Sequence, residues 1–188
     1  MTKIVIVEGP DNIGKDTLIN KLKCSFKTPI VFHAGVPDEN FSLFDFYYNG
    51  LIHNTLDTYY KRSNDIVIHN RSIYGEFVYG HKYRGMLPGD AAELVYKLES
   101  GQLRTFIPED DLFLIVLTST DIDLLANNDD GKSLSLANKD NIKYEVDAFD
   151  TIFKLSEIKN KKRIVVNNGN SFRNSNEIYK EVYNFITK

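Results

Sequence analysis

The chain is organised around the stretch Gly9-Pro10-Asp11-Asn12-Ile13-Gly14-Lys15-Asp16-Thr17. It follows an apolar run over residues 4–7, which predicts a buried strand, and it precedes a helical pattern over residues 18–22. Glycine at each end of such a loop lets the backbone approach a polyphosphate closely, with successive N–H groups pointing inward. The start of the helix adds a partial positive charge, and Lys15 adds a full one. The stretch therefore predicts a polyphosphate-binding site.

Strand, glycine-bounded loop, lysine and helix occur here in the order of a P-loop. The alternative is an ordinary strand-to-helix turn with an exposed lysine. One position departs from the usual motif, in which a Ser or Thr hydroxyl after the lysine meets Mg²⁺. Asp16 occupies that position and Thr17 follows it. These two residues are the candidate metal ligands, although Asp16 could equally be a first-turn acid favoured by the helix dipole.

Length and composition indicate a single soluble domain spanning residues 1–188. Apolar residues make up 42% of the chain and charged residues 26%, and no apolar run approaches the ~20 residues of a membrane span. The net charge of −3 does not favour nonspecific binding to duplex nucleic acid. We expect no signal peptide, no membrane partner and a cytoplasmic location. The one cysteine, Cys24, is expected to be a small packing residue of the first helix.

Strands and helices are predicted to alternate along the whole chain. Strands are expected at residues 3–8, 29–33, 65–69, 112–117 and 163–166, with turn residues Gly35, Pro37 and Asp38 after the second. Helices are expected at residues 14–26, 41–61 with an interruption at Gly50, 71–83, 90–99 with Asp90 as its own cap, 141–155 and 177–186. The polar, glycine-bearing residues 126–137 predict a loop or lid. This pattern predicts an α/β fold of three layers, in which helices flank a parallel five-stranded sheet.

In such a fold, ligands bind at the carboxyl ends of the strands. Arg71 directly follows a buried strand, where its planar guanidinium could grip a phosphate with two donors; the alternative is a surface salt bridge. His33 ends the second strand, and could equally be a hydrogen-bonded histidine of ordinary structural kind. Phe46, Tyr74 and Tyr79 belong to aromatic segments that could line a nucleobase pocket, although most of these aromatic residues are expected in the core.

Several stretches together resemble the thymidylate kinases and the related deoxynucleoside kinases. Residues 8–15 match the Glu-Gly-x-Asp-x-x-Gly-Lys pattern of the thymidylate kinases, and Asn70-Arg71-Ser72 falls where these families have Asp-Arg-Tyr or Glu-Arg-Ser. Residues 110–117 are similar to the fourth strand, and Asp130-Gly131-Lys132 before the helix that bears Glu145 resembles the lid. The resemblance spans nearly the whole chain, and its P-loop is the specific part. Small variants of this kind that are poor in arginine tend to be viral, which implies a phage source and a host cytoplasm.

The resemblance implies a role for each matching residue. Gly9, Asn12, Ile13, Gly14, Lys15, Asp16 and Thr17 would bind the donor phosphates of ATP, with Mg²⁺ bridging them. Asp11 would face the sugar or phosphate of the acceptor, Arg71 would hold the acceptor phosphate, and Lys132 would close over the transferring group from a lid at about residues 126–140. Catalysis of this kind is mostly positioning and charge neutralisation.

Two departures from the family concern charge. The family supplies an arginine to the transferring phosphoryl group from the P-loop or from the lid, but Asn12 stands in the P-loop, Asn127 and Asn128 stand in the lid, and no arginine occurs between Arg104 and Arg163. Such an arginine is worth about 10³–10⁵ in rate. Asn70 also replaces the acid that precedes the strand-three arginine. Either Lys132 or another group substitutes, or the enzyme is slow, or the acceptor is not dTMP.

Three hypotheses about function follow. The first is an ATP-dependent kinase of a deoxynucleoside monophosphate, with dTMP or a modified pyrimidine nucleotide as the small-molecule acceptor. The second is a kinase of a hydroxyl group, on a deoxynucleoside or on 5-hydroxymethyluracil in phage DNA, for which Asp11, Asp16 or His33 could act as the base. The third is a P-loop protein that binds nucleotide without turnover. A homodimer through the aromatic segment 41–60 is expected by analogy alone.

Overall fold

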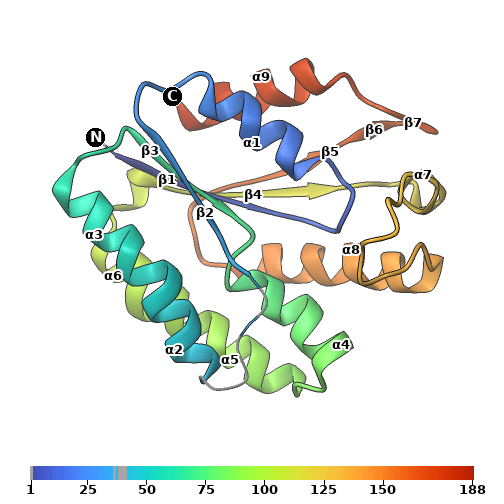
Figure 1. Ribbon diagram of the computed structural model, residues 1–188, viewed down its shortest axis with the longest axis horizontal. Helices are drawn as coiled ribbons and strands as arrows, with labels where there is room; N and C mark the ends of the chain where they lie inside the picture. Colours follow the sequence, from blue (N-terminus) through green and yellow to red (C-terminus); the bar gives the residue numbers. More distant parts are fainter. Residues whose placement is uncertain (1, 36, 38–41) are drawn as a thin grey trace.

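A parallel five-stranded sheet lies at the centre of the structure, a computed structural model that describes residues 2–35, 37 and 42–188. The strands are β1 (Lys3–Glu8), β2 (Pro29–His33), β3 (Ile66–Asn70), β4 (Leu112–Thr118) and β5 (Asn160–Val165). Their spatial order is β2-β3-β1-β4-β5, so β1 lies between β3 and β4 (Figure 1). Ile4 of β1 stands opposite Val67 of β3 and Leu112 of β4. The P-loop that follows β1 therefore leaves from the middle of the sheet.

Helices cover both faces of this sheet, as Figure 1 shows. Helices α1 (Lys15–Lys23) and α9 (Ser175–Ile186) lie on one face, and α3 (His53–Lys61), α5 (Pro88–Leu98) and α8 (Lys139–Leu155) lie on the other. The alternation of side chains along β1 explains the two layers: Ile4 and Ile6 pack in one apolar cluster, and Val5 and Val7 pack in the other. Both sides of β4 are buried as well, which accounts for its continuous apolar run.

Shorter elements connect these layers. They are α2 (Leu43–Tyr47), α4 (His81–Arg84), α6 (Arg104–Phe106), α7 (Ile122–Asn127), the π-helical turns η1 (Tyr48–Ile52), η2 (Glu76–Gly80) and η3 (Glu99–Leu103), the 3₁₀ turn η4 (Glu109–Asp111), and the strands β6 (Asn167–Asn168) and β7 (Ser171–Phe172). The last two pair as a small antiparallel hairpin between β5 and α9. No helix within the described residues is both long and apolar enough to span a membrane.

The predicted fold class is confirmed, and all five predicted strands are present. Strand β5 begins at Asn160, three residues before the predicted start, because its pairing with β4 extends to Phe113 through polar residues that carry no apolar signal. The β6–β7 hairpin is missing from the sequence prediction for the same reason, since Asn167 and Asn168 are polar.

The helical segments match the prediction at Gly50 and differ from it at Asp90 and Cys24. Asp90 does not cap α5: the helix begins at Pro88, whose missing N–H suits a first-turn position, and Asp90 lies within the first turn. The interruption at Gly50 is the π-helical turn η1 between α2 and α3. Cys24 is exposed at the carboxyl end of α1, so the expectation of a packing residue is wrong. The predicted turn residue Asp38 and the predicted helix start at Phe41 lie outside the described residues.

The segment predicted as a lid is a compact loop between two helices. Helix α7 reaches Asn127, and the Asn138 side chain caps α8 by accepting hydrogen bonds from Asp140 N and Asn141 N. Within the loop, Asp129 accepts from Gly131 N at 2.7 Å and from Ala137 N at 2.9 Å, and its second oxygen also accepts from the Ser133 hydroxyl. One carboxylate thus holds both ends of the turn.

Candidate active site

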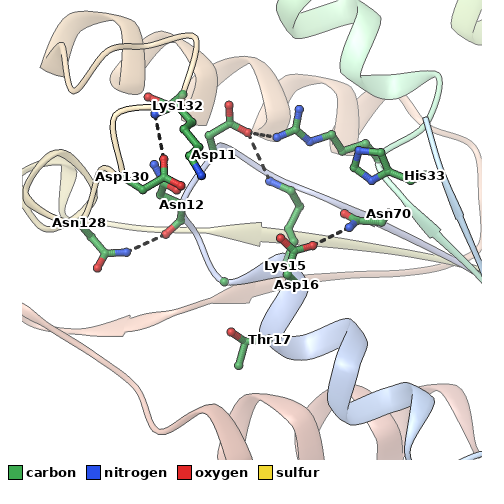
Figure 2. Close-up of a pocket in the computed structure, with 13 residues that line it drawn as sticks. Asp11, Asn12, Lys15, Asp16, Thr17, His33, Asn70, Asn128, Asp130 and Lys132 are labelled. Carbon is green, nitrogen blue, oxygen red and sulfur yellow. Dashed lines mark hydrogen bonds and ion pairs between the residues drawn. The ribbon is translucent and has the colours of Figure 1, made fainter. Parts of the chain in front are cut away.

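A cavity of about 330 Å³ opens at the carboxyl ends of β1, β2 and β3. Figure 2 shows side chains from the P-loop, from the ends of β2 and β3, and from the loop before α8 around it. It is lined by Asp11, Asn12, Gly14, Lys15, Asp16, Thr17, His33, Asn70, Arg71, Asn128, Asp130, Lys132 and Ser133. Three cationic side chains and three carboxylates are in this set, so the lining carries no net charge. A polyphosphate bound here needs a further positive charge.

Two glycines give the P-loop its shape. Gly9 has φ 141°, and a Cβ at this position would lie 2.5 Å from the carbonyl oxygen of Leu117 on the neighbouring strand. Gly14 has φ 93° and stands directly before α1. Glycine adopts such backbone angles at little cost, whereas residues with a Cβ do not. The loop can therefore fold back over β4 and direct the start of α1 toward the cavity.

Lys15 is held inside the loop by main-chain oxygens. Its side chain is only 6% exposed, and its ammonium donates to the carbonyl oxygens of Gly9 at 2.7 Å and Pro10 at 2.5 Å. The pKa of this ammonium is lowered to about 8, by burial first and by the charge of Arg71 second, while the charge of Asp11, 4.0 Å away, opposes the shift. Phosphate oxygens are stronger acceptors than these carbonyls. Lys15 is thus placed to exchange loop carbonyls for an anionic ligand.

Arg71 faces the P-loop across the cavity. It follows β3 directly, its guanidinium forms an ion pair with the Asp11 carboxylate, and it lies 5.9 Å from the centre of the Tyr79 ring. Its side chain remains 36% exposed and lines the cavity. The structure therefore brings together the cation, the acid and the lysine that the sequence singles out, from positions up to 60 residues apart.

Asp16 and Asn70 form the part of the site that suits a metal ion. Asn70 donates to Asp16 Oδ1 at 2.6 Å, while its own amide oxygen is buried and has no hydrogen-bond partner among the described residues (Figure 2). No group of three or more His, Cys, Asp or Glu side chains in the described part of the chain could hold a metal alone. Mg²⁺ is usually bound through one or two carboxylates plus substrate phosphates and waters, so this donor set fits it. Thr17 lines the same cavity.

A second pocket, of about 200 Å³, lies on the other side of the P-loop. It shares Asn12, Gly14, Thr17 and Asn128 with the main cavity, and the rest of its lining is mostly apolar: Ile13, Leu18, Leu117, Val166, Phe172, Arg173, Ser175 and Ile178. Phe172 comes from β7, and Ser175 and Ile178 come from α9, two elements to which the sequence analysis assigns no part of the site. An apolar slot continuous with a phosphate site suits the flat base of a nucleotide.

Glu145 is a functional candidate that the sequence reasoning did not assign a role. It is 1% exposed; one carboxylate oxygen accepts from the Tyr83 hydroxyl at 2.7 Å, and the other is buried without a partner in the described residues. Burial raises its pKa to about 7, and the charge of Asp11 adds to the shift. Its position between Ile142 and Phe149 on the apolar face of α8 is the signal that could have identified it, because a glutamate there is rare without a reason.

The predicted site residues separate into two groups. The structure gathers Asp11, Asn12, Gly14, Lys15, Asp16, Thr17, His33, Arg71 and Lys132 around the cavity, with Gly9 behind the loop and Ile13 facing the second pocket. Tyr79 is buried beneath Arg71. The prediction is wrong for Tyr74, which is fully buried and donates to Glu99 at 2.6 Å. Phe46 does not line the cavity either, and packs edge-on against Tyr47 at 5.1 Å between ring centres.

Solved structures that match this fold include two thymidylate kinases and a protein solved with a phosphorylated nucleotide. The thymidylate kinase of Candida albicans matches with a TM-score of 0.67 at 13% identity, over 99% of this chain and 91% of its own. The YorR protein of Bacillus subtilis, in complex with phosphorylated GDP, matches with a TM-score of 0.65 at 15% identity, over 98% and 96%. The thymidylate kinase of Ehrlichia chaffeensis matches with a TM-score of 0.57 at 13% identity, over 97% of each chain. The chain has a thymidylate kinase-like fold.

This likeness covers 91–97% of each of these three chains, so it concerns the whole fold and not the P-loop segment alone. No family model matches the chain, and no curated protein matches it. At 13–15% identity the solved structures establish the fold, and the chemistry has to be argued from the side chains around the cavity.

Proposed function

We propose that this protein is an ATP-dependent nucleotide kinase that transfers the γ-phosphoryl group to a deoxynucleoside monophosphate, with dTMP or a modified pyrimidine nucleotide as the favoured acceptor. The observation that carries the proposal is the placement of Lys15 and Arg71 across one cavity. A protein that only binds nucleotide needs the lysine side of this cavity. A second cation held opposite it suits an acceptor that is itself an anion.

The donor is proposed to lie along the P-loop. Its phosphates would meet Lys15 and the loop N–H groups at the start of α1, and its base would enter the apolar pocket beside Phe172. Asn128 donates to the carbonyl oxygen of Asn12 at 3.2 Å, which ties the loop before α8 to the P-loop where both pockets meet. Bound Mg²⁺ would neutralise charge on the phosphates. Asp16, oriented by Asn70, and Thr17 are the residues proposed to hold it.

The acceptor phosphate is proposed to lie against Arg71, with Asp11 facing its sugar. An anionic acceptor needs no general base, so positioning and charge account for the transfer. Apart from Arg71, the described residues that line the cavity include no arginine that could meet the transferring phosphoryl group. The loop before α8 supplies a lysine there, Lys132. Arg173 lines the second pocket, but its guanidinium donates to Val165 O and pairs with Glu181. We therefore assign the role at the transferring group to Lys132, and expect a slow enzyme.

A kinase of a hydroxyl acceptor is the second candidate, favoured by one observation. His33 is exposed at the end of β2 and lines the same cavity as Asp11. Either side chain could accept the proton of a hydroxyl group. The acceptor would then be a deoxynucleoside or a hydroxymethylated pyrimidine in DNA.

Transfer of labelled γ-phosphate from Mg·ATP to a matched panel tests the proposal. The panel contains dTMP, the other deoxynucleoside monophosphates, GMP and GDP, free deoxynucleosides, and DNA with and without 5-hydroxymethyluracil. Label on a monophosphate supports the proposed function, whereas label on a nucleoside or on DNA selects the hydroxyl acceptor. Nucleotide binding without label on any acceptor contradicts both, and leaves a P-loop protein without turnover.

A further inference from the structure

Arg71 adopts a backbone conformation that residues with a side chain rarely take. Its φ is 65°, in the left-handed region. Such a conformation is strained and persists only where the surroundings determine it. In this conformation the guanidinium pairs with Asp11 and lines the cavity. Some neighbouring group therefore has to hold the chain on either side of Arg71.

The last two residues of β1 hold the backbone at Arg71 and Ser72. Arg71 N donates to the carbonyl oxygen of Val7 at 3.2 Å, which continues the pairing of β1 with β3. The next residue, Ser72, donates from its N–H at 2.7 Å and from its hydroxyl at 2.9 Å to one oxygen of Glu8. The carboxylate thus binds both donors of the residue that follows the arginine, and it fixes the turn in which φ is positive.

No contact of Glu8 with either pocket gives it a direct role in the site. It is fully buried, it does not line either pocket, and its second carboxylate oxygen has no partner among the described residues. Burial raises its pKa to about 7, an effect opposed by its contact with Ser72 and by the charges of Lys15 and Arg71. A desolvated carboxylate with one oxygen unpaired is costly. A buried carboxylate with one unpaired oxygen, close enough to feel the charges of Lys15 and Arg71, therefore requires an explanation.

We propose that Glu8 is the positioning residue of Arg71, holding the arginine's strained turn through Ser72 so that the guanidinium meets the acceptor phosphate. The carboxylate touches no substrate and acts through the arginine alone. It is the last residue of β1, directly before Gly9, so the contact to the acceptor clamp and the first residue of the donor loop are adjacent in the chain. The kinetic part of the test rests on the proposed function; the spectroscopic part does not.

The kinetic test compares Glu8→Gln with Glu99→Gln. Glu99 is a matched control, since it is 3% exposed and accepts from a tyrosine hydroxyl at 2.6 Å and a backbone N–H at 2.7 Å outside the cavity. We expect Glu8→Gln to raise the acceptor KM about 10–100-fold, while the ATP KM stays within about twofold. Glu99→Gln should lower stability and leave both KM values unchanged. An equal rise for acceptor and ATP, or no rise, overturns the inference.

A double-mutant cycle with Arg71→Ala separates positioning from general damage. If Glu8 acts through the arginine, Glu8→Gln has no further effect on the acceptor KM once Arg71 is alanine. An effect that persists in that background shows a different role and overturns the inference. Ser72→Ala removes the hydroxyl hydrogen bond and leaves the N–H bond, so it should raise the acceptor KM by a smaller factor than Glu8→Gln. This variant replaces Glu8→Gln in the test if Glu8→Gln does not fold.

NMR of the ligand-free protein tests the contact without any reaction. We expect the Ser72 amide proton to lie downfield, as in other charge-assisted hydrogen bonds, and the Arg71 side-chain N–H signals to be resolved. In Glu8→Gln or Ser72→Ala the Arg71 signals should broaden or average, and in Glu99→Gln they should not. Unchanged Ser72 and Arg71 signals overturn the inference even if the enzyme is active. Failure of all transfer, with these signals changed as expected, counts against the proposed function alone.

Discussion

Lys15 stands where the P-loop, α1 and the cavity meet, and its ammonium bonds loop carbonyls at 2.5–2.7 Å in the ligand-free protein. Lys15→Ala removes the full positive charge that the donor phosphates would meet. We expect the transfer rate to fall by at least about 10²–10³-fold, comparable to the loss of one preorganised donor. Lys23→Ala, at the exposed end of the same helix, is the control and should retain activity. A fully active Lys15→Ala enzyme would mean that this loop is not the donor site.

Arg71 and Asp11 form an ion pair, so removal of either side chain leaves the charge of the other without its partner. Arg71→Ala should raise the acceptor KM about 10²-fold and change the ATP KM little, since the guanidinium is assigned to the acceptor phosphate. Steady-state kinetics with each substrate varied in turn measures both constants. Lys82→Ala, an exposed cation on α4, provides the control. Equal weakening of donor and acceptor would place Arg71 at the donor instead.

At the scale of elements, the N-terminus of α1 and the end of β3 meet through Asp16 and Asn70. The usual P-loop motif has a hydroxyl residue directly after the lysine, and the resemblance to thymidylate kinases implies an acid directly before the arginine. This chain has a carboxylate, Asp16, at the first position and an amide, Asn70, at the second. Asp16→Asn should weaken Mn²⁺ binding to the protein–ADP complex about 10–100-fold, as measured by electron paramagnetic resonance. The pair Asp16→Ser with Asn70→Asp should restore much of that affinity.

The control for this pair is Asp140→Asn, which removes an exposed first-turn acid from α8. It should leave Mn²⁺ binding unchanged. If Asp16→Asn also leaves it unchanged, Asp16 is the first-turn acid that the helix dipole favours, and the metal is held by the phosphates and Thr17 alone.

Elements with a strong local signal are predicted well from the sequence, and the others are not. Strands β1 and β4 are continuous apolar runs, and their positions match the prediction to within one residue. Strand β5 begins with Asn160, Lys161 and Lys162, three polar residues whose sequence predicts a loop. They are in a strand because they pair with β4. The aromatic segments mislead for a related reason: apolar periodicity marks Tyr74 as facing inward but does not say whether inward means core or cavity.

At the scale of the whole molecule, two buried carboxyls set the pH dependence of stability. Burial raises the pKa of Glu8 and of Glu145 to about 7, above the ordinary value of 4.5. The folded state therefore binds more protons than the unfolded state between these values, and the free energy of unfolding falls as pH rises toward about 7. His69 acts in the opposite direction, because burial lowers its pKa to about 3 and folding then releases protons below its ordinary 6.5.

We expect the two carboxyls to outweigh the one histidine between pH 6 and 7.5, with a loss of about 1–3 kcal/mol as pH rises. Urea unfolding at pH 6, 6.75 and 7.5 measures this change; Lys15 stays largely protonated in both states over this range, which lies below its folded-state pKa of about 8. Glu145→Gln should flatten the profile and Glu93→Gln, on the exposed face of α5, should not. Stability that rises through this range in the wild-type protein would contradict the assignment.

The sequence by itself determined the glycine-bounded loop, the alternation of strands and helices, and hence the parallel sheet. These depend on local patterns: glycines that permit unusual backbone angles, apolar runs of strand length, and helical periodicity. Only the tertiary structure decided which distant residues meet. The pairing of β1 with both β3 and β4 brings Arg71 to Asp11, Asn70 to Asp16 and Ser72 to Glu8, and packing of α8 places Glu145 beside them. Such contacts arise from chain topology, and their energies come from burial that no local pattern records.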